Sequence, residues 1–177
     1  MHIKETKLRG AYLIEPEQFA DERGWFARAW SEAELNAAGI RERFVEANLS
    51  YNYKRGTLRG LHWQADPHGQ GKLIRCTRGA IFDVGVDIRR ESQTYGHWMS
   101  AELTAENRLM LYLPAGFAHG YLTVADDSEV LYLVTSGYVP ESGRGARWND
   151  PAFNIRWPQL GELIINQRDK DYPDFRL

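Results

Sequence analysis

The chain has 177 residues, 43% of them hydrophobic, and a formal net charge of −2 at pH 7. This length suits one domain with a substantial core, and the charge gives no reason to expect a nucleic-acid surface. No apolar run approaches the ~18 residues of a membrane-spanning helix, and the N-terminal segment lacks the apolar stretch of an export signal. The single cysteine, Cys76, fits a reducing compartment. We therefore expect one domain over residues 1–177, located in the cytoplasm, with no membrane or nucleic-acid partner.

One helix is readable in the first quarter of the chain. Ser31 is a suitable N-cap, and Glu34 stands three residues later as the partner of a capping box. Leu35 would lie on the buried side, and Gly39 would end the helix.

Most of the remaining chain is typical of short strands separated by turn residues. Residues 82–88 alternate apolar and polar side chains, which predicts a half-buried strand with a polar opposite face. Residues 130–135 are almost continuously apolar and β-branched, which favours a strand buried on both sides. The apolar run at 11–14 could add to the sheet of a neighbouring copy. The segment 163–165 is expected to pack back on the body of the protein.

The stretch from Gly56 to Gly79 has the spacing of the first metal motif of a cupin barrel, but it lacks the metal ligands. His62 occupies the first histidine position, whereas Gln64 and Lys72 occupy the second histidine and the carboxylate positions. A charged lysine has only hydrogen-bond donors and cannot ligate a metal. We therefore expect no metal and no other cofactor. A histidine beside a fixed cation suits proton abstraction next to a carbonyl, with the cation stabilising the oxyanion.

A second cupin signature follows at the expected place. Residues 114–119, PAGFAH, match the pattern P-x-G-x-x-H. The two motifs together predict an all-β, cupin-type jelly-roll barrel or sandwich with one or two short helices.

Several longer phrases resemble the dTDP-4-dehydrorhamnose 3,5-epimerase family over almost the whole chain. The resemblance implies a homodimer that binds a nucleotide-diphospho-4-keto-6-deoxyhexose and inverts carbon centres of its sugar without a metal. It places this reaction in deoxysugar, rhamnose and polysaccharide synthesis. The matching phrases are DERGWF (21–26), LRGLHWQ (58–64), QGKLIR (70–75), FDVGVDIR (82–89), PAGFAHGYL (114–122) and RWNDP (147–151).

The resemblance also implies catalytic roles. His62 matches the base, and histidine is the side chain that changes charge nearest neutral pH. Asp169 matches the carboxylate that orients this base, and Tyr132 matches the residue that delivers a proton on the other face of the sugar. Lys72 would lie beside the C4 oxygen and stabilise the enolate.

Further matching positions imply the substrate-binding set. Arginine suits a diphosphate because its planar fork can bond two oxygens at once, and Tyr138 would stack on the base. The implied set is Arg23, Phe26, Arg28, Glu46, Asn48, Arg59, Lys72, His119, Tyr138 and Arg168.

The chain departs from the thymidine-specific pattern near the expected base. Arg28 stands in place of an acid, Glu46 in place of a glutamine, and Gly143 in place of a glutamate. Leu133 replaces the lysine after the catalytic tyrosine, and Arg168 replaces a lysine. An acid exchanged for an arginine swaps acceptors for donors, so dTDP, CDP and GDP sugars all stay open, as does inversion at C3 alone or at C3 and C5.

Two rival functions belong to other classes. A metal-dependent cupin enzyme is disfavoured by Gln64 and Lys72, which offer a metal poor ligands. A non-catalytic sugar-nucleotide binder is disfavoured by the presence of a matched base and acid, because binding alone requires neither.

Overall fold

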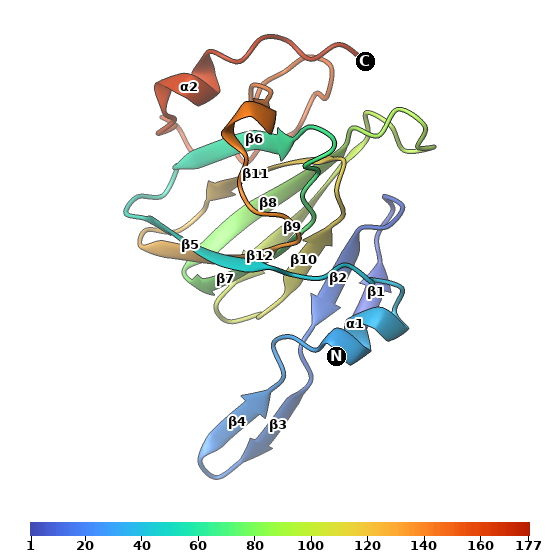
Figure 1. The fold of residues 1–177 in the computed structure, drawn as a ribbon. Helices are drawn as coiled ribbons and strands as arrows, with labels where there is room; N and C mark the ends of the chain where they lie inside the picture. The colour runs from blue at the N-terminus through green and yellow to red at the C-terminus, as the bar shows by residue number, and fades with distance from the viewer.

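The computed structural model describes residues 1–177 and contains two antiparallel sheets that face each other (Figure 1). This arrangement confirms the predicted all-β jelly roll with two short helices. The six-stranded sheet has the order β1 (His2–Glu5), β2 (Tyr12–Glu15), β10 (Met110–Leu113), β7 (Lys72–Arg78), β12 (Ser128–Val134) and β5 (Glu46–Asn52). The five-stranded sheet has the order β13 (Gly143–Gly145), β6 (Leu58–Gln64), β11 (Phe117–Thr123), β8 (Ala80–Asp87) and β9 (Trp98–Thr104).

The predicted helix is α1 (Glu32–Ala37), and its N-cap is confirmed. The Ser31 side chain accepts a hydrogen bond from the Glu34 backbone N–H at 3.4 Å, and Leu35 is buried. Only half of the capping box forms. The Glu34 carboxylate instead pairs with the ammonium of Met1 at 2.6 Å and with Arg28 at 2.5 Å. None of the helices is long and apolar enough to cross a membrane.

Strand β8 is buried on both faces, so the prediction of a half-buried strand was wrong. Asp83 and Asp87 point to the inner side and are fully buried. On the outer side, Val84 and Val86 pack against the C-terminal segment, including Trp157. The alternation of polar and apolar residues is real, but here the polar face lines the barrel interior.

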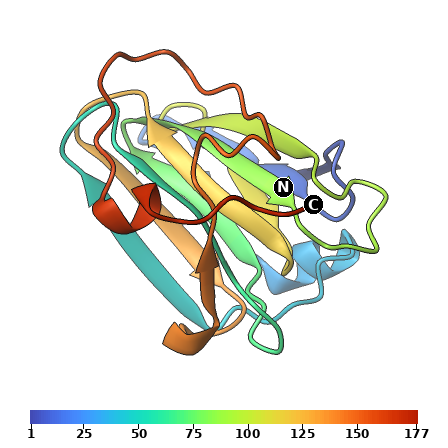
Figure 2. The ribbon, with the colours of Figure 1, turned by 90° about the horizontal axis from the view of Figure 1, so that it is seen from above.

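The C-terminal segment, which contains the 3-10 turn η1 (Pro140–Ser142) and α2 (Gln167–Lys170), crosses over the five-stranded sheet (Figure 2). Leu163 and Ile165 pack on that sheet, and the Ile164 carbonyl accepts a hydrogen bond from the Leu58 N–H at 2.9 Å. The expected packing of 163–165 is therefore confirmed.

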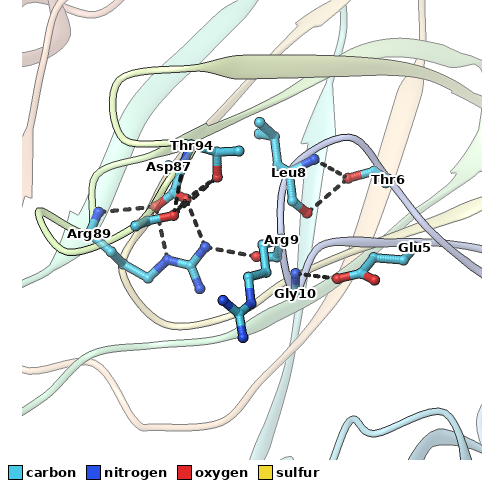
Figure 3. Close-up of polar contacts among 9 residues, drawn as sticks. Glu5, Thr6, Leu8, Arg9, Gly10, Asp87, Arg89 and Thr94 are labelled. Atoms are coloured by element: carbon cyan, nitrogen blue, oxygen red, sulfur yellow. Dashed lines mark hydrogen bonds and ion pairs between the residues drawn. The ribbon is translucent and has the colours of Figure 1, made fainter.

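Asp87 anchors the end of β8 to two loops (Figure 3). Burial alone would raise its pKa, but hydrogen bonds from Arg89, Ser92 and Thr94 lower it to about 2. Arg89 also donates to the Arg9 carbonyl oxygen at 2.7 Å, which ties the N-terminal loop to this end of the barrel.

The outer face of the six-stranded sheet is only partly covered. Residues of α1 and the following loop pack on β2, β7 and β10. Near β5 and β12 the face stays open, with Leu49 66% exposed and Leu131 and Leu133 half-buried. The prediction that 130–135 is buried on both sides was therefore wrong. The predicted addition of 11–14 to a neighbour's sheet was also wrong, because β2 is paired with β1 and β10 on its two edges.

A separate hairpin projects away from the two sheets (Figure 1). It consists of β3 (Gln18–Asp21) and β4 (Gly24–Ala27). Three of its aromatic side chains are largely exposed: Phe19, Trp25 and Phe26.

Candidate active site

A cavity of about 280 Å³ is lined by side chains of both sheets and of α2. Strands β5, β6, β7, β11 and β12 contribute side chains to it, together with the segment 138–144, which contains η1 and the start of β13. Eight of the predicted site residues line it: Arg59, His62, Lys72, His119, Tyr132, Tyr138, Arg168 and Asp169.

His62 on β6 and Asp169 on α2 form a direct pair. His62 Nε2 lies 2.7 Å from Asp169 Oδ1, and Asp169 Oδ2 accepts a hydrogen bond from the Gly60 N–H at 3.0 Å. Burial alone would raise the pKa of Asp169, but these two hydrogen bonds outweigh it and lower the pKa. The carboxylate therefore holds the imidazole proton on Nε2, which leaves Nδ1 free to accept a proton.

Gly60 explains why this part of β6 can approach β11 so closely. Its φ is +114°, and a Cβ there would lie 2.6 Å from the Gly120 Cα and 2.7 Å from the His119 carbonyl oxygen. Only glycine fits such a contact. The close approach brings His62 and His119 opposite each other in the sheet register.

A second histidine–carboxylate pair lies deeper in the cavity. His119 Nε2 is 2.8 Å from Asp83 Oδ1, while the buried Oδ2 of Asp83 has no hydrogen-bond partner. Burial lowers the pKa of Lys72 to about 8, although the Asp83 carboxylate opposes this shift. Burial likewise lowers the pKa of His119. The cavity floor therefore offers the Lys72 ammonium as a donor that can stabilise an oxyanion. Asp83 was missed by the sequence analysis.

Tyr132 reaches the cavity from the opposite sheet. It lies on β12, paired with β7, whereas His62 lies on β6 of the five-stranded sheet. Burial raises the pKa of the Tyr132 hydroxyl, which keeps it protonated at neutral pH. A base on one wall and a protonated acid on the other can act on opposite faces of a flat intermediate.

The cavity carries an excess of positive charge. Lys72, Arg59, Arg144 and Arg168 line it, and none of them takes part in an ion pair. Asp169 is its only lining carboxylate residue, and it is bonded to the histidine. Such an environment attracts an anionic ligand. Arg144 was also missed by the sequence analysis, because a charged residue in a predicted loop is usually interpreted as solvent-exposed.

Five predicted binding residues do not line the cavity of this chain. Arg23 and Phe26 lie on the projecting hairpin, where Arg23 pairs with Asp21, and Arg28 pairs with Glu34. On β5, Asn48 is paired in register with Tyr132 and donates to the Glu46 carboxylate at 3.0 Å, beyond the cavity lining.

The would-be metal ligand Gln64 is occupied by backbone groups. Its Nε2 donates to the carbonyl oxygens of His68 and Gly137, and its Oε1 accepts the Val139 N–H at 2.6 Å. No group of three or more His, Cys, Asp or Glu side chains is arranged to hold a metal ion. Gln64 therefore fixes the loop that carries Tyr138.

Comparison with known proteins gives one family. Residues 5–176 match the model of the dTDP-4-dehydrorhamnose 3,5-epimerase family. The Sinorhizobium fredii dTDP-4-dehydrorhamnose 3,5-epimerase is 43% identical over 98% of this chain and 89% of its own length. The Bacillus anthracis enzyme of the same name, solved with TDP and PPi bound, is 38% identical with a TM-score of 0.94, covering 98% of this chain and 99% of that chain.

A third relative acts at one centre. The 3'-monoepimerase ChmJ from Streptomyces bikiniensis, solved with dTDP-quinovose, is 34% identical with a TM-score of 0.87, covering 96% of this chain and 85% of that one. These neighbours share the cupin-type jelly roll expected from the two sequence motifs. With a full-length family match and close agreement of the folds, the chain belongs to the dTDP-4-dehydrorhamnose 3,5-epimerase family.

Proposed function

We propose that this chain is an isomerase that epimerises a nucleotide-diphospho-4-keto-6-deoxyhexose at C3 and C5, without metal or cofactor. One observation carries the proposal. The His62–Asp169 pair and Tyr132 reach one cavity from two different sheets, and Lys72 lies in the same cavity.

The proposed reaction uses the acidity of hydrogens next to a ketone. Nδ1 of His62 removes a proton from C3 or C5. The electron pair of the broken C–H bond stays on the sugar and forms an enolate whose negative charge lies on the C4 oxygen. The Lys72 ammonium stabilises this oxyanion. His119, paired with Asp83, lines the cavity beside it. Tyr132 returns a proton to the opposite face, which inverts the carbon and regenerates the ketone.

Substrate binding in this proposal uses the unpaired cations of the cavity. Arg59 and Arg168 would hold the diphosphate, and Tyr138, which is 60% exposed at the rim, would stack on the base. Arg59 is already oriented by a 2.8 Å hydrogen bond from its Nε to the Asn52 side-chain oxygen.

The proposed function is tested by solvent exchange. The protein is incubated with dTDP-4-keto-6-deoxyglucose in heavy water containing a metal chelator, and the sugar is analysed by NMR. We expect deuterium at C3 and C5 together with inverted product. Binding without exchange would favour the non-catalytic binder, and activity that vanishes with the chelator and returns with a divalent ion would favour the metal-dependent cupin enzyme.

A second candidate is the same chemistry on a CDP- or GDP-linked sugar. It is favoured by Arg28, Glu46 and Gly143, which alter the donors and acceptors expected near the base. Inversion at C3 alone is a further alternative, since ChmJ is a 3'-monoepimerase. Thermal shifts with TDP, CDP and GDP distinguish the bases, because the preferred nucleotide raises the melting temperature most.

We also infer that residues 1–177 form one domain that acts in the cytoplasm as a homodimer. The open sheet face at Leu49 and the projecting hairpin with Phe26 are apolar surfaces that a second copy would cover. A second copy would also explain how Arg23 and Arg28 approach a substrate. Light scattering at assay concentration should give twice the chain mass of 20.4 kDa, whereas a monomer would contradict the inference.

Activity should fall as the pH rises through about 8, because Lys72 acts as a cation and burial lowers its pKa to about 8. The protonated form predominates below that pH and is lost above it, so kcat should decline about tenfold per unit on the alkaline side. The check is a kcat profile from about pH 6.5 to about pH 9.5. Any activity left in Lys72→Arg should lack this decline, since arginine stays charged. A flat wild-type profile would contradict the role of Lys72.

A further inference from the structure

Tyr172, just beyond α2, contacts two residues of the site, Arg168 and His62. Its hydroxyl accepts a hydrogen bond from Arg168 Nε at 2.7 Å. Its ring lies edge-on to the His62 imidazole, with 6.0 Å between the ring centroids and an interplanar angle of 67°. The hydrogen bond to Tyr172 raises the pKa of Arg168. The tyrosine therefore links the base to a cation that lies farther along the cavity.

The hydrogen bond determines which edge of Arg168 is free. Nε is occupied by the Tyr172 hydroxyl, which leaves the two terminal nitrogens at the other edge of the guanidinium. The Tyr138 hydroxyl also lies close enough to this guanidinium to raise the pKa of Arg168. Beside them is Gly143, where a Cβ would lie 3.7 Å from Arg168 Nη2 and 3.5 Å from the Tyr138 hydroxyl. The glycine thus leaves space next to an oriented pair of N–H donors.

The ring of Tyr172 is seated against β13. A Cβ at Gly145 would lie 2.2 Å from Tyr172 Cε2, so only glycine leaves room for the ring. With Gly145 on one side and His62 on another, the ring has little freedom to move. The Tyr172 hydroxyl is therefore held in one position, and its hydrogen bond orients Arg168.

We propose that Tyr172 is a positioning residue that fixes the guanidinium of Arg168, so that its two terminal nitrogens bind two oxygens of the substrate diphosphate. Paired N–H donors in a planar fork match phosphate oxygens bidentately, and orientation in advance lowers the cost of ordering the side chain on binding. This proposal rests on the proposed function, because it assigns a place to the diphosphate of that substrate.

The test is Tyr172→Phe, which keeps the ring beside Gly145 and His62 but removes the hydroxyl. We expect KM to rise about fivefold to tenfold with kcat within about twofold of wild type, since a hydrogen bond to a charged group is lost away from the reacting atoms. Calorimetry should show the same loss of affinity for TDP and for inorganic pyrophosphate. Tyr51→Phe is the matched control, because it removes a hydroxyl that donates to Asp127 at 2.7 Å outside the cavity.

A double-mutant cycle separates positioning from general loss of structure. In an Arg168→Met background, Tyr172→Phe should have no further effect on pyrophosphate affinity. Equal loss in both backgrounds, unchanged affinity in the single variant, or weakening for TDP but not for pyrophosphate would each overturn the proposal. Pyrophosphate binding is measured without turnover, so a failure here is distinct from an absence of epimerase activity in the wild type.

Discussion

His62→Asn should lower the rate of epimerisation about 10³-fold or more and abolish deuterium uptake at both C3 and C5. The asparagine retains a polar side chain on β6, but it cannot accept the substrate proton. Affinity for the nucleoside diphosphate should stay within about twofold, because the cations that bind it are separate side chains. The measurements are deuterium uptake by NMR and binding by calorimetry.

His97→Asn is the matched control, since this exposed histidine lies outside the cavity and should leave exchange and turnover unchanged. Asp169→Asn removes the carboxylate of the His62–Asp169 pair. It should also reduce the rate severely, because the imidazolium loses its 2.7 Å carboxylate partner. Normal turnover in His62→Asn would refute the assignment of the base.

Tyr132→Phe should separate exchange from inversion. The base can still remove a proton and restore deuterium on its own face, so substrate exchange should persist. Delivery to the opposite face loses its acid, and inverted product should fall about 10²-fold. Chiral analysis of the product alongside deuterium content measures the two events in one sample.

Tyr112→Phe is a suitable control for this variant, because Tyr112 is a buried tyrosine on β10 that packs on the opposite face of the six-stranded sheet. Tyr112→Phe should change neither the deuterium content nor the amount of inverted product. If Tyr132→Phe inverted its substrate at the normal rate, water or another side chain would be the acid on the second face.

The residues that the sequence identified correctly in the cavity lie where a motif fixes the backbone. His62 and Lys72 are spaced by one cupin motif, and His119 ends the other, so the barrel itself brings them together. Asp169 lies 107 residues from His62, and no local pattern could connect the two. Its place was implied by the resemblance to the family alone.

The alternation of polar and apolar residues along the strands did not predict correctly which side chains face the barrel interior and which face solvent. Asp83 alternates with apolar neighbours as a solvent-facing residue would, yet it lies inside the barrel because the C-terminal segment covers the other face of β8. Leu131 and Leu133 have the pattern of core residues, but their side of β12 is only partly covered within one chain. The periodicity of a strand shows that its two faces differ in polarity. Which face is exposed to water depends on the segments and other chains that pack against the strand.

The short turn α2 has a consequence for the active fraction of the enzyme. Four residues cannot form a stable helix alone, so the turn is kept in place by contacts with the barrel, such as those of Asp169 with Gly60 and His62. Local opening of this tail removes the partner of the base and a cation in a single event, while the barrel stays folded. A ligand at 100 times its Kd favours the closed tail by about 2.7 kcal/mol. We therefore expect the amides of 167–172 to become protected from hydrogen exchange in proportion to ligand occupancy.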